Sequence, residues 1–166
     1  MTIHSTDPFA TPEDQRSPVR RLRGRLPGPV TLWTAPGPAG LTVSSTLVAD
    51  GDPARILGLL DAESELWPAI EAAGRFAVIP LGPADRQLAD RFAGLLPAPG
   101  GLFSGDSWRV TAHGPVPADH PTVVLCELAE SRPLGWSLLV IGVIEQIELG
   151  EGEPLVHHRG RYRELR

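Results

Sequence analysis

Hydroxyl side chains are concentrated in one short segment of the chain, residues 41–46 (LTVSST), directly after Gly40. Alternate residues of an extended strand share a face, so Thr42, Ser44 and Thr46 would lie on one side. Side chains this small let a planar ligand approach the backbone and bond to its N–H and C=O groups. The same composition also suits an edge strand whose outer face carries Ser and Thr, and the sequence leaves both interpretations open.

Ser64 is the second candidate, because it begins an apolar pattern typical of a helix that ends at Gly74. The free N–H groups at the start of a helix bind phosphate readily. Ser64 could equally be an ordinary helix cap, which needs no ligand. Glu63 and Glu65 flank it, and like charges about 4 Å apart repel by roughly 1 kcal/mol in water, which disfavours a phosphate.

A basic run precedes Pro27 and contains Arg16, Arg20, Arg21, Arg23 and Arg25. Charge runs usually face water, so this segment can be a short solvated stretch. Arginine also matches phosphate oxygens, so the run can instead contact a phosphate or a dinucleotide.

The remaining reactive side chains point to structure rather than chemistry. His157 and His158 have no third ligand at a recognisable spacing, so we expect no metal site. His113 and His120 fall in predicted loops, where we expect them to be solvated. Cys126 alternates with apolar neighbours and is predicted to lie in the core.

Composition excludes several classes of protein. All fifteen basic side chains are Arg, so Schiff-base chemistry and a lysine-bearing phosphate loop are absent. The net charge of −5 argues against general nucleic-acid binding. No apolar run approaches the ~20 residues that span a bilayer, and no secretory signal is seen at the N-terminus. With 166 residues and one cysteine, we expect one cytoplasmic domain over residues 16–166 after a disordered tail, residues 1–15.

Glycine and proline number 18 each, which indicates many turns and short elements. Two short helices are predicted, at residues 64–73 and 83–93. Strands are predicted at residues 29–34, 41–49, 54–60, 76–81, 107–112, 122–131 and 137–149, before a last segment at 154–165. With few helices between the strands, the pattern favours a mostly β fold, an antiparallel barrel or sandwich.

Seven pieces of the chain occur in a recognisable order: PVTLWT (29–34), GLTVSST (40–46), DP (52–53), SELWPAIEAAGRFAVIPL (64–81), LADRFAG (88–94), GWSLLVIG (135–142) and PLVHHRGRYREL (154–165). Together they resemble the flavin reductase-like domain family. That resemblance covers roughly residues 18–165. It implies the FMN-binding split barrel, an antiparallel Greek-key β-barrel with a few short helices.

The resemblance implies where a flavin would bind. Its backbone-lined ring site corresponds to residues 41–45, its ribityl phosphate loop to residues 61–66, and a further wall to residues 91–93. A motif matching Arg161 and Tyr162 approaches the cofactor across a homodimer. The flavin contacts implied are therefore Leu41, Thr42, Val43, Ser44, Ser45, Asp61, Ser64, Leu66, Arg91, Phe92, Ala93, Arg161 and Tyr162.

Two departures from the family pattern stand out. Many relatives have a basic or hydroxyl-rich phosphate loop, whereas this chain has acids on both sides of Ser64. Riboflavin or exchangeable FMN thus becomes an alternative to tightly held FMN. Relatives also carry a histidine near the nicotinamide, where this chain has Trp136 and Ser137. These two residues are the candidates for the nicotinamide side.

Two functions follow from the resemblance. The first is a flavin reductase that passes hydride from NADH or NADPH directly to FMN, FAD or riboflavin, with no catalytic side chain needed for that step. It would supply reduced flavin to a partner monooxygenase. The second is a non-catalytic flavin-binding or carrier protein of the same fold, which the missing histidine motivates.

Overall fold

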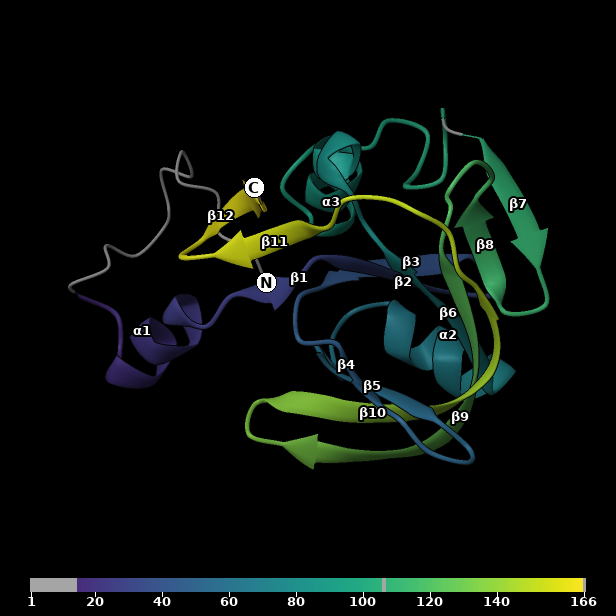
Figure 1. Cartoon of the computed structure of the whole chain (residues 1–166), viewed down its shortest axis with the longest axis horizontal. Helices are drawn as coiled ribbons and strands as arrows, with labels where there is room; N and C mark the ends of the chain where they lie inside the picture. The colour runs from purple at the N-terminus through teal and green to yellow at the C-terminus, as the bar shows by residue number, and fades with distance from the viewer. Residues whose placement is uncertain (1–14, 106, 166) are drawn as a thin grey trace.

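The computed structural model describes residues 15–105 and 107–165. Its main sheet has the strand order β3-β2-β6-β9-β10-β5-β4, and all neighbouring strands are antiparallel. The strands are β2 (Thr31–Ala35), β3 (Ala39–Val43), β4 (Leu47–Ala49), β5 (Arg55–Leu60), β6 (Arg75–Pro80), β9 (Val123–Leu134) and β10 (Ser137–Glu148). Figure 1 shows this sheet curling into a barrel. The two edge strands, β3 and β4, are joined by residues 44–46, so this short link bridges the open side.

Apolar residues alternate along the strands between two cores, as the period of two requires. Inside the barrel, Trp33 stacks on Phe76 with ring centroids 4.9 Å apart, and both are fully buried. The helix α2 (Leu66–Ala73) adds Leu66 and Ile70 to this inner core. On the outer face, Leu32 belongs to a second core.

The second core is covered by shorter elements. The 3-10 turn η2 (Pro83–Asp85) leads into α3 (Arg86–Phe92), and the hairpin of β7 (Trp108–Thr111) and β8 (Gly114–Pro117) lies nearby. A small sheet has the order β1-β11-β12, formed by β1 (Gly28–Pro29), β11 (Leu155–His158) and β12 (Arg161–Glu164). The first helix, α1 (Pro18–Arg25), stands to one side of the barrel in Figure 1.

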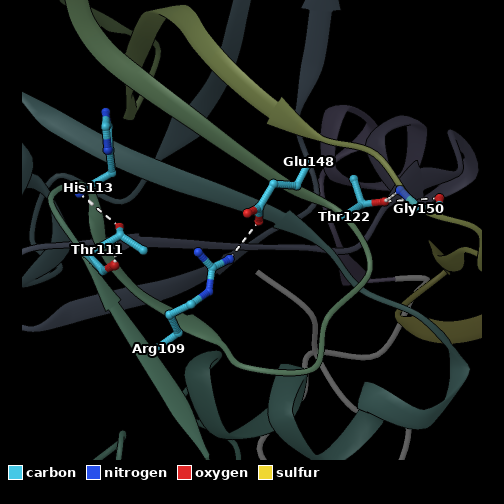
Figure 2. A network of polar contacts seen from close by, with 7 residues as sticks. Arg109, Thr111, His113, Thr122, Glu148 and Gly150 are labelled. Carbon is cyan, nitrogen blue, oxygen red and sulfur yellow. Dashed lines mark hydrogen bonds and ion pairs between the residues drawn. The ribbon is translucent and has the colours of Figure 1, made fainter.

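Side-chain contacts fasten the β7–β8 hairpin beside β10, and we call this region the β7–β8 flank (Figure 2). Arg109 forms an ion pair with Glu148 at 2.7 Å, and His113 Nε2 lies 2.8 Å from a carboxylate oxygen of Glu145. Thr111 Oγ1 donates to the Gly114 carbonyl and accepts from the backbone of His113. The flank is thus bonded within the chain.

The mostly β prediction is confirmed, but several boundaries were wrong. The basic run is mostly exposed, in agreement with a solvated stretch, but it forms the helix α1, which was not predicted, because Ser17 accepts from Arg20 N as an N-cap and Pro18 occupies the first turn. The strand predicted at 41–49 breaks into β3 and β4. The helix predicted from Ser64 begins at Leu66, with Glu65 at the N-cap.

Further strands were missed. β8 was not predicted, and the last segment is a hairpin of two strands, β11 and β12. The helix predicted at 83–93 is η2 followed by α3. Most of the expected tail, residues 1–14, lies outside the described residues. In the part of the chain that is described, every helix falls short of the length and apolarity that a membrane span needs.

Candidate functional site

The break between β3 and β4 produces an unusual stretch of backbone. The ladder of β3 ends at Val43 and that of β4 begins at Leu47, so the N–H and C=O groups of residues 44–46 lie outside both ladders. The link is held by Thr46, whose hydroxyl lies 2.8 Å from Thr31 Oγ1 and accepts from Trp33 Nε1 at 3.0 Å. The link is therefore fixed in place although its backbone groups are outside the sheet ladders.

Ser45 connects the link to the next predicted segment. Its hydroxyl donates to the Leu59 carbonyl at 3.1 Å and accepts from the Leu59 N–H at 2.9 Å, in the manner of a strand neighbour. Two residues later Asp61 begins a turn in which it accepts from Glu63 N and Ser64 N. Residues 44–46 and 61–64 therefore lie at one edge of the barrel.

Helix α3 joins this edge to the C-terminal hairpin. Thr42 Oγ1 donates to the Ala89 carbonyl at 2.6 Å. One residue along the helix, Asp90 accepts a hydrogen bond from Tyr162 Oη at 2.8 Å. The predicted contacts at residues 41–45, 91–93 and 161–162 are thus linked through α3, with Arg161 exposed beside Tyr162 on β12.

The predicted flavin contacts differ in what their side chains do. Val43, Leu66, Phe92 and Ala93 are buried in the cores, so only their backbones could meet a ligand. Leu41 is partly buried against the inner core. The hydroxyls of Thr42 and Ser45 are bonded within the chain, as described above. These thirteen contacts remain predictions.

Ser64 has the side chain that most plainly lacks a partner. Its Oγ is buried and has no hydrogen-bond partner among the described residues. A buried hydroxyl without a bond is costly, so such a group marks a place where a ligand or water can bond. Ser44 adds a half-buried hydroxyl that forms no side-chain hydrogen bond within residues 15–105 and 107–165. The free backbone at 44–46 and the Ser64 hydroxyl fit the polar edge and ribityl chain of a flavin.

Trp136 lies at the tip of the β9–β10 hairpin, where Gly135 has a φ of 59° and Ser137 pairs with Leu134. Its side chain is fully exposed, so it packs on nothing in the described chain. The register pairs Leu138 with Leu60. The hairpin tip therefore lies beside Asp61, and the two nicotinamide-side candidates lie next to the 61–64 turn.

A cavity of about 380 Å³ lies between α3 and the segment 117–120. Its lining shares only Arg91 with the predicted flavin contacts. His120 Nε2 lies 2.9 Å from Asp85 Oδ2 there, and the bond from His120 helps to lower the pKa of Asp85 although burial opposes it. His113 and His120 lie in loops as predicted, but the prediction that they are solvated was wrong, because each side chain is largely buried against a carboxylate.

Two other titratable groups are buried. Burial raises the pKa of the Cys126 thiol to about 12, which makes it unreactive and agrees with the predicted core position. Burial lowers the pKa of His157 to about 4, and the charge of Arg23 acts in the same direction. The described residues contain no cluster of three or more His, Cys, Asp or Glu side chains that could hold a metal ion.

Sequence reasoning missed several residues that shape the site. Thr31 and Trp33 hold Thr46, and Asp90 holds Tyr162. Gly28 also matters, since a Cβ on it would collide with the backbone carbonyl of Ser44. The only sequence signal for these roles is a polar residue or a glycine within an apolar run. Such a signal does not indicate which residue it contacts in the fold.

The barrel thus has a seam, residues 44–46 between β3 and β4, whose backbone groups lie outside the sheet ladders. The Ser64 hydroxyl at the same edge has no partner among the described residues. The sequence profile of the flavin reductase like domain matches residues 23–166, and the chain belongs to this family. The structure accordingly has the split-barrel fold of flavin reductases.

Individual relatives are consistent with this family assignment. The chain is 31% identical to an NADH-dependent FMN reductase of Streptomyces nodosus subsp. asukaensis, over 93% of this chain and 87% of the relative. It is 28% identical to the reductase component of a 4-hydroxyphenylacetate 3-monooxygenase of Thermus thermophilus, over 76% of this chain and 78% of the relative. An NADH:FAD oxidoreductase of Streptomyces globisporus, solved with NAD and FAD fragments, superposes with a TM-score of 0.82 at 21% identity, over 95% and 96% of the two chains.

Proposed function

We propose that this protein is an NAD(P)H-dependent flavin reductase that acts as a homodimer and supplies reduced flavin to a partner monooxygenase. The observation that carries the proposal is the seam at residues 44–46, where backbone groups outside the sheet ladder lie beside the unpaired Ser64 hydroxyl. Curated relatives named as an NADH-dependent FMN reductase and as a monooxygenase reductase component support the reaction and the partner class.

In this proposal, different residues bind different parts of the flavin. Backbone N–H and C=O groups of residues 44–46 hold the polar edge of the ring, and Ser64 bonds to the ribityl chain or its phosphate. A bound flavin supplies the electron sink that accepts hydride, so no general base of the chain is needed in that step. The chain's task is to hold two flat rings with the reacting atoms roughly 3–3.5 Å apart.

Trp136 and Ser137 border the nicotinamide side in this proposal. Trp136 is fully exposed at the hairpin tip, next to the 61–64 turn. An aromatic ring there can stack on a nicotinamide, which positions the dinucleotide without a histidine.

One assay tests the proposal. Purified protein is mixed with FMN, FAD or riboflavin, and oxidation of NADH and of NADPH is followed separately. Consumption of either nucleotide with any of the flavins is the expected result. If flavin binds and neither nucleotide is oxidised, the reductase proposal fails and the carrier function is the correct one.

A variant tests the role of Ser64. Ser64→Glu adds a charge where the flavin chain is proposed to lie, so FMN affinity should fall about tenfold or more, whereas riboflavin affinity falls less. Fluorescence titration of both flavins measures this difference. Ser104→Glu places the same charge on an exposed loop and should change neither affinity. An equal loss of both flavins in Ser64→Glu would contradict a phosphate contact.

A further inference from the structure

The charges of the chain are divided unevenly between its body and its two ends. Residues 27–158 contain sixteen carboxylates and six arginines, a net charge of −10. Residues 16–26 contain five arginines and no acid, and residues 159–166 contain four arginines and one glutamate. These two basic segments lie together, because Arg159 N donates to the Gly24 carbonyl at 2.8 Å. An acidic body therefore carries one basic arm.

The arm is uncovered. Val19, Leu22 and Leu26 are 74%, 59% and 64% exposed, and none of the eight residues of α1 is buried in the described chain. Isolated helices this short are marginal in water, so they depend on packing against another surface. Arg21 and Arg25 flank Leu22 in a shallow hollow of about 230 Å³. The helix thus offers an apolar stripe bordered by positive charge.

A second surface of the same chain is uncovered and has the opposite charge. Strand β4 is an edge of the main sheet, and Leu47 and Val48 on it are 64% and 66% exposed. An exposed apolar edge strand is normally covered or blunted. Exposed acids lie beyond both ends of the strand, namely Asp50 and Asp52 on one side and Asp61, Glu63 and Glu65 on the other.

We propose that α1 of one copy of this protein docks on the β4 edge of a second copy, with its arginines against the carboxylates of the 61–65 turn. Within one chain both surfaces stay exposed, so they do not cover each other. Between two copies, each apolar stripe meets an apolar edge and each basic border meets an acidic one. A two-fold axis makes this contact twice.

The contact would complete the flavin site, and in this respect it rests on the proposed function. Glu63 and Glu65 surround Ser64 with negative charge that repels a phosphate. No ion pair within residues 15–105 and 107–165 holds Arg21 or Arg25. Arginines from the second copy offset the two glutamates, and they supply the positive charge that the phosphate loop of a single chain lacks.

The test is the oligomeric state of the flavin-free full chain, measured by sedimentation. The wild-type protein should sediment as a dimer of 17.8 kDa chains at micromolar concentration. Arg21→Glu/Arg25→Glu should raise the dimer dissociation constant about tenfold or more, as should Glu63→Arg/Glu65→Arg. Mixing these two variants should restore both contacts in a heterodimer, one through the reversed charges and one through the native charges. The control Arg75→Glu reverses the charge of an exposed arginine elsewhere and should leave the dimer intact.

Failure of the docking proposal can be distinguished from failure of the reductase proposal. A wild-type monomer at all concentrations, or an Arg21→Glu/Arg25→Glu variant that dimerises as well as the control, would overturn the docking proposal whatever the reductase assay gives. A dimer that responds to these variants supports it even if no nucleotide is oxidised. The arm variant should also lose more affinity for FMN than for riboflavin. Equal losses would refute the completion of the phosphate site.

Discussion

Two sides of this barrel differ in how their polar groups are bonded and how their apolar groups are covered. On the β7–β8 flank, Arg109, Thr111 and His113 each bond within the chain (Figure 2). At the opposite seam, the Ser64 hydroxyl is buried without a partner among the described residues. Trp136 there is fully exposed. The three polar side chains of the flank are bonded within one chain, whereas the Ser64 hydroxyl is not bonded to any described residue.

This difference separates scaffold from function. Buried polar groups in folded proteins are almost always bonded, and large exposed apolar groups usually mark contact surfaces. On the β7–β8 flank, Arg109, Thr111 and His113 meet the first expectation, although Trp108 Nε1 is buried without a partner among the described residues and Val110 is 87% exposed. The seam departs from both, and the proposed flavin and the proposed second copy would account for these departures.

The largest expected effect is on stability, and it concerns two histidines that can be compared in the same way. His113 is bonded to Glu145, whereas His157 has a buried Nε2 with no partner in the described part of the chain and a pKa of about 4. Below pH 6.5 the unfolded chain binds a proton at this residue that the folded chain does not. The free energy of unfolding should therefore fall by roughly 2–3 kcal/mol as the pH drops from about 6.5 to about 4.

Urea unfolding of the wild type and of His157→Gln measures this effect. The variant should lose less stability than the wild type over the same pH range, because its side chain does not titrate. Identical pH profiles would show that His157 is as free to bind a proton in the folded chain as in the unfolded one.

A matched pair of smaller changes compares the seam with the flank directly. Thr46→Val removes the hydroxyl that lies between Thr31 and Trp33. It should cost about 1–2 kcal/mol and lower flavin affinity several-fold, because residues 44–46 are no longer fixed. Thr111→Val removes a similar hydroxyl from the flank and should cost about 1 kcal/mol without changing flavin affinity. Thermal unfolding measures the stability of both variants, and flavin titration measures their flavin affinity. Equal losses of flavin affinity would contradict a difference between the seam and the flank.

The smallest effect is expected at the exposed pair Arg109–Glu148, whose side chains are 44% and 38% exposed. Glu148→Gln should cost less than about 1 kcal/mol, because water screens such a pair. The loss should shrink further in high salt. A large loss that salt does not alter would mean that the flank depends on this ion pair more than its exposure suggests.

The residue pattern was sufficient for a mostly β fold and for most strands, because the apolar residues of β6, β9 and β10 fill the two cores. It left a barrel and a sandwich open, and the resemblance to the family implied the barrel. The residue pattern was not sufficient at the seam. The run from Leu41 to Ala49 has uniform strand propensity, and only the bonds of Ser45 and Thr46 to distant strands break it into two. Such long-range bonds leave no local signal.

The site shows the same limit. Thr42, Ser44 and Thr46 were predicted to share one face, yet the hydroxyls of Thr42 and Thr46 are bonded to protein and that of Ser44 has no such bond among the described residues. Ser64 was expected to cap a helix or meet a phosphate, and the helix begins two residues later. Local propensity identified the right segments, but tertiary contacts determined which side chains stay available.

Gly28 gives the arm and the seam a shared mechanical element. The chain leaves α1, passes Pro27 and at Gly28 presses its backbone against the carbonyl of Ser44, where no side chain would fit. The basic arm and residues 44–46 are therefore joined through Gly28, and a side chain at this position would disturb the proposed docking helix and the proposed flavin contacts together.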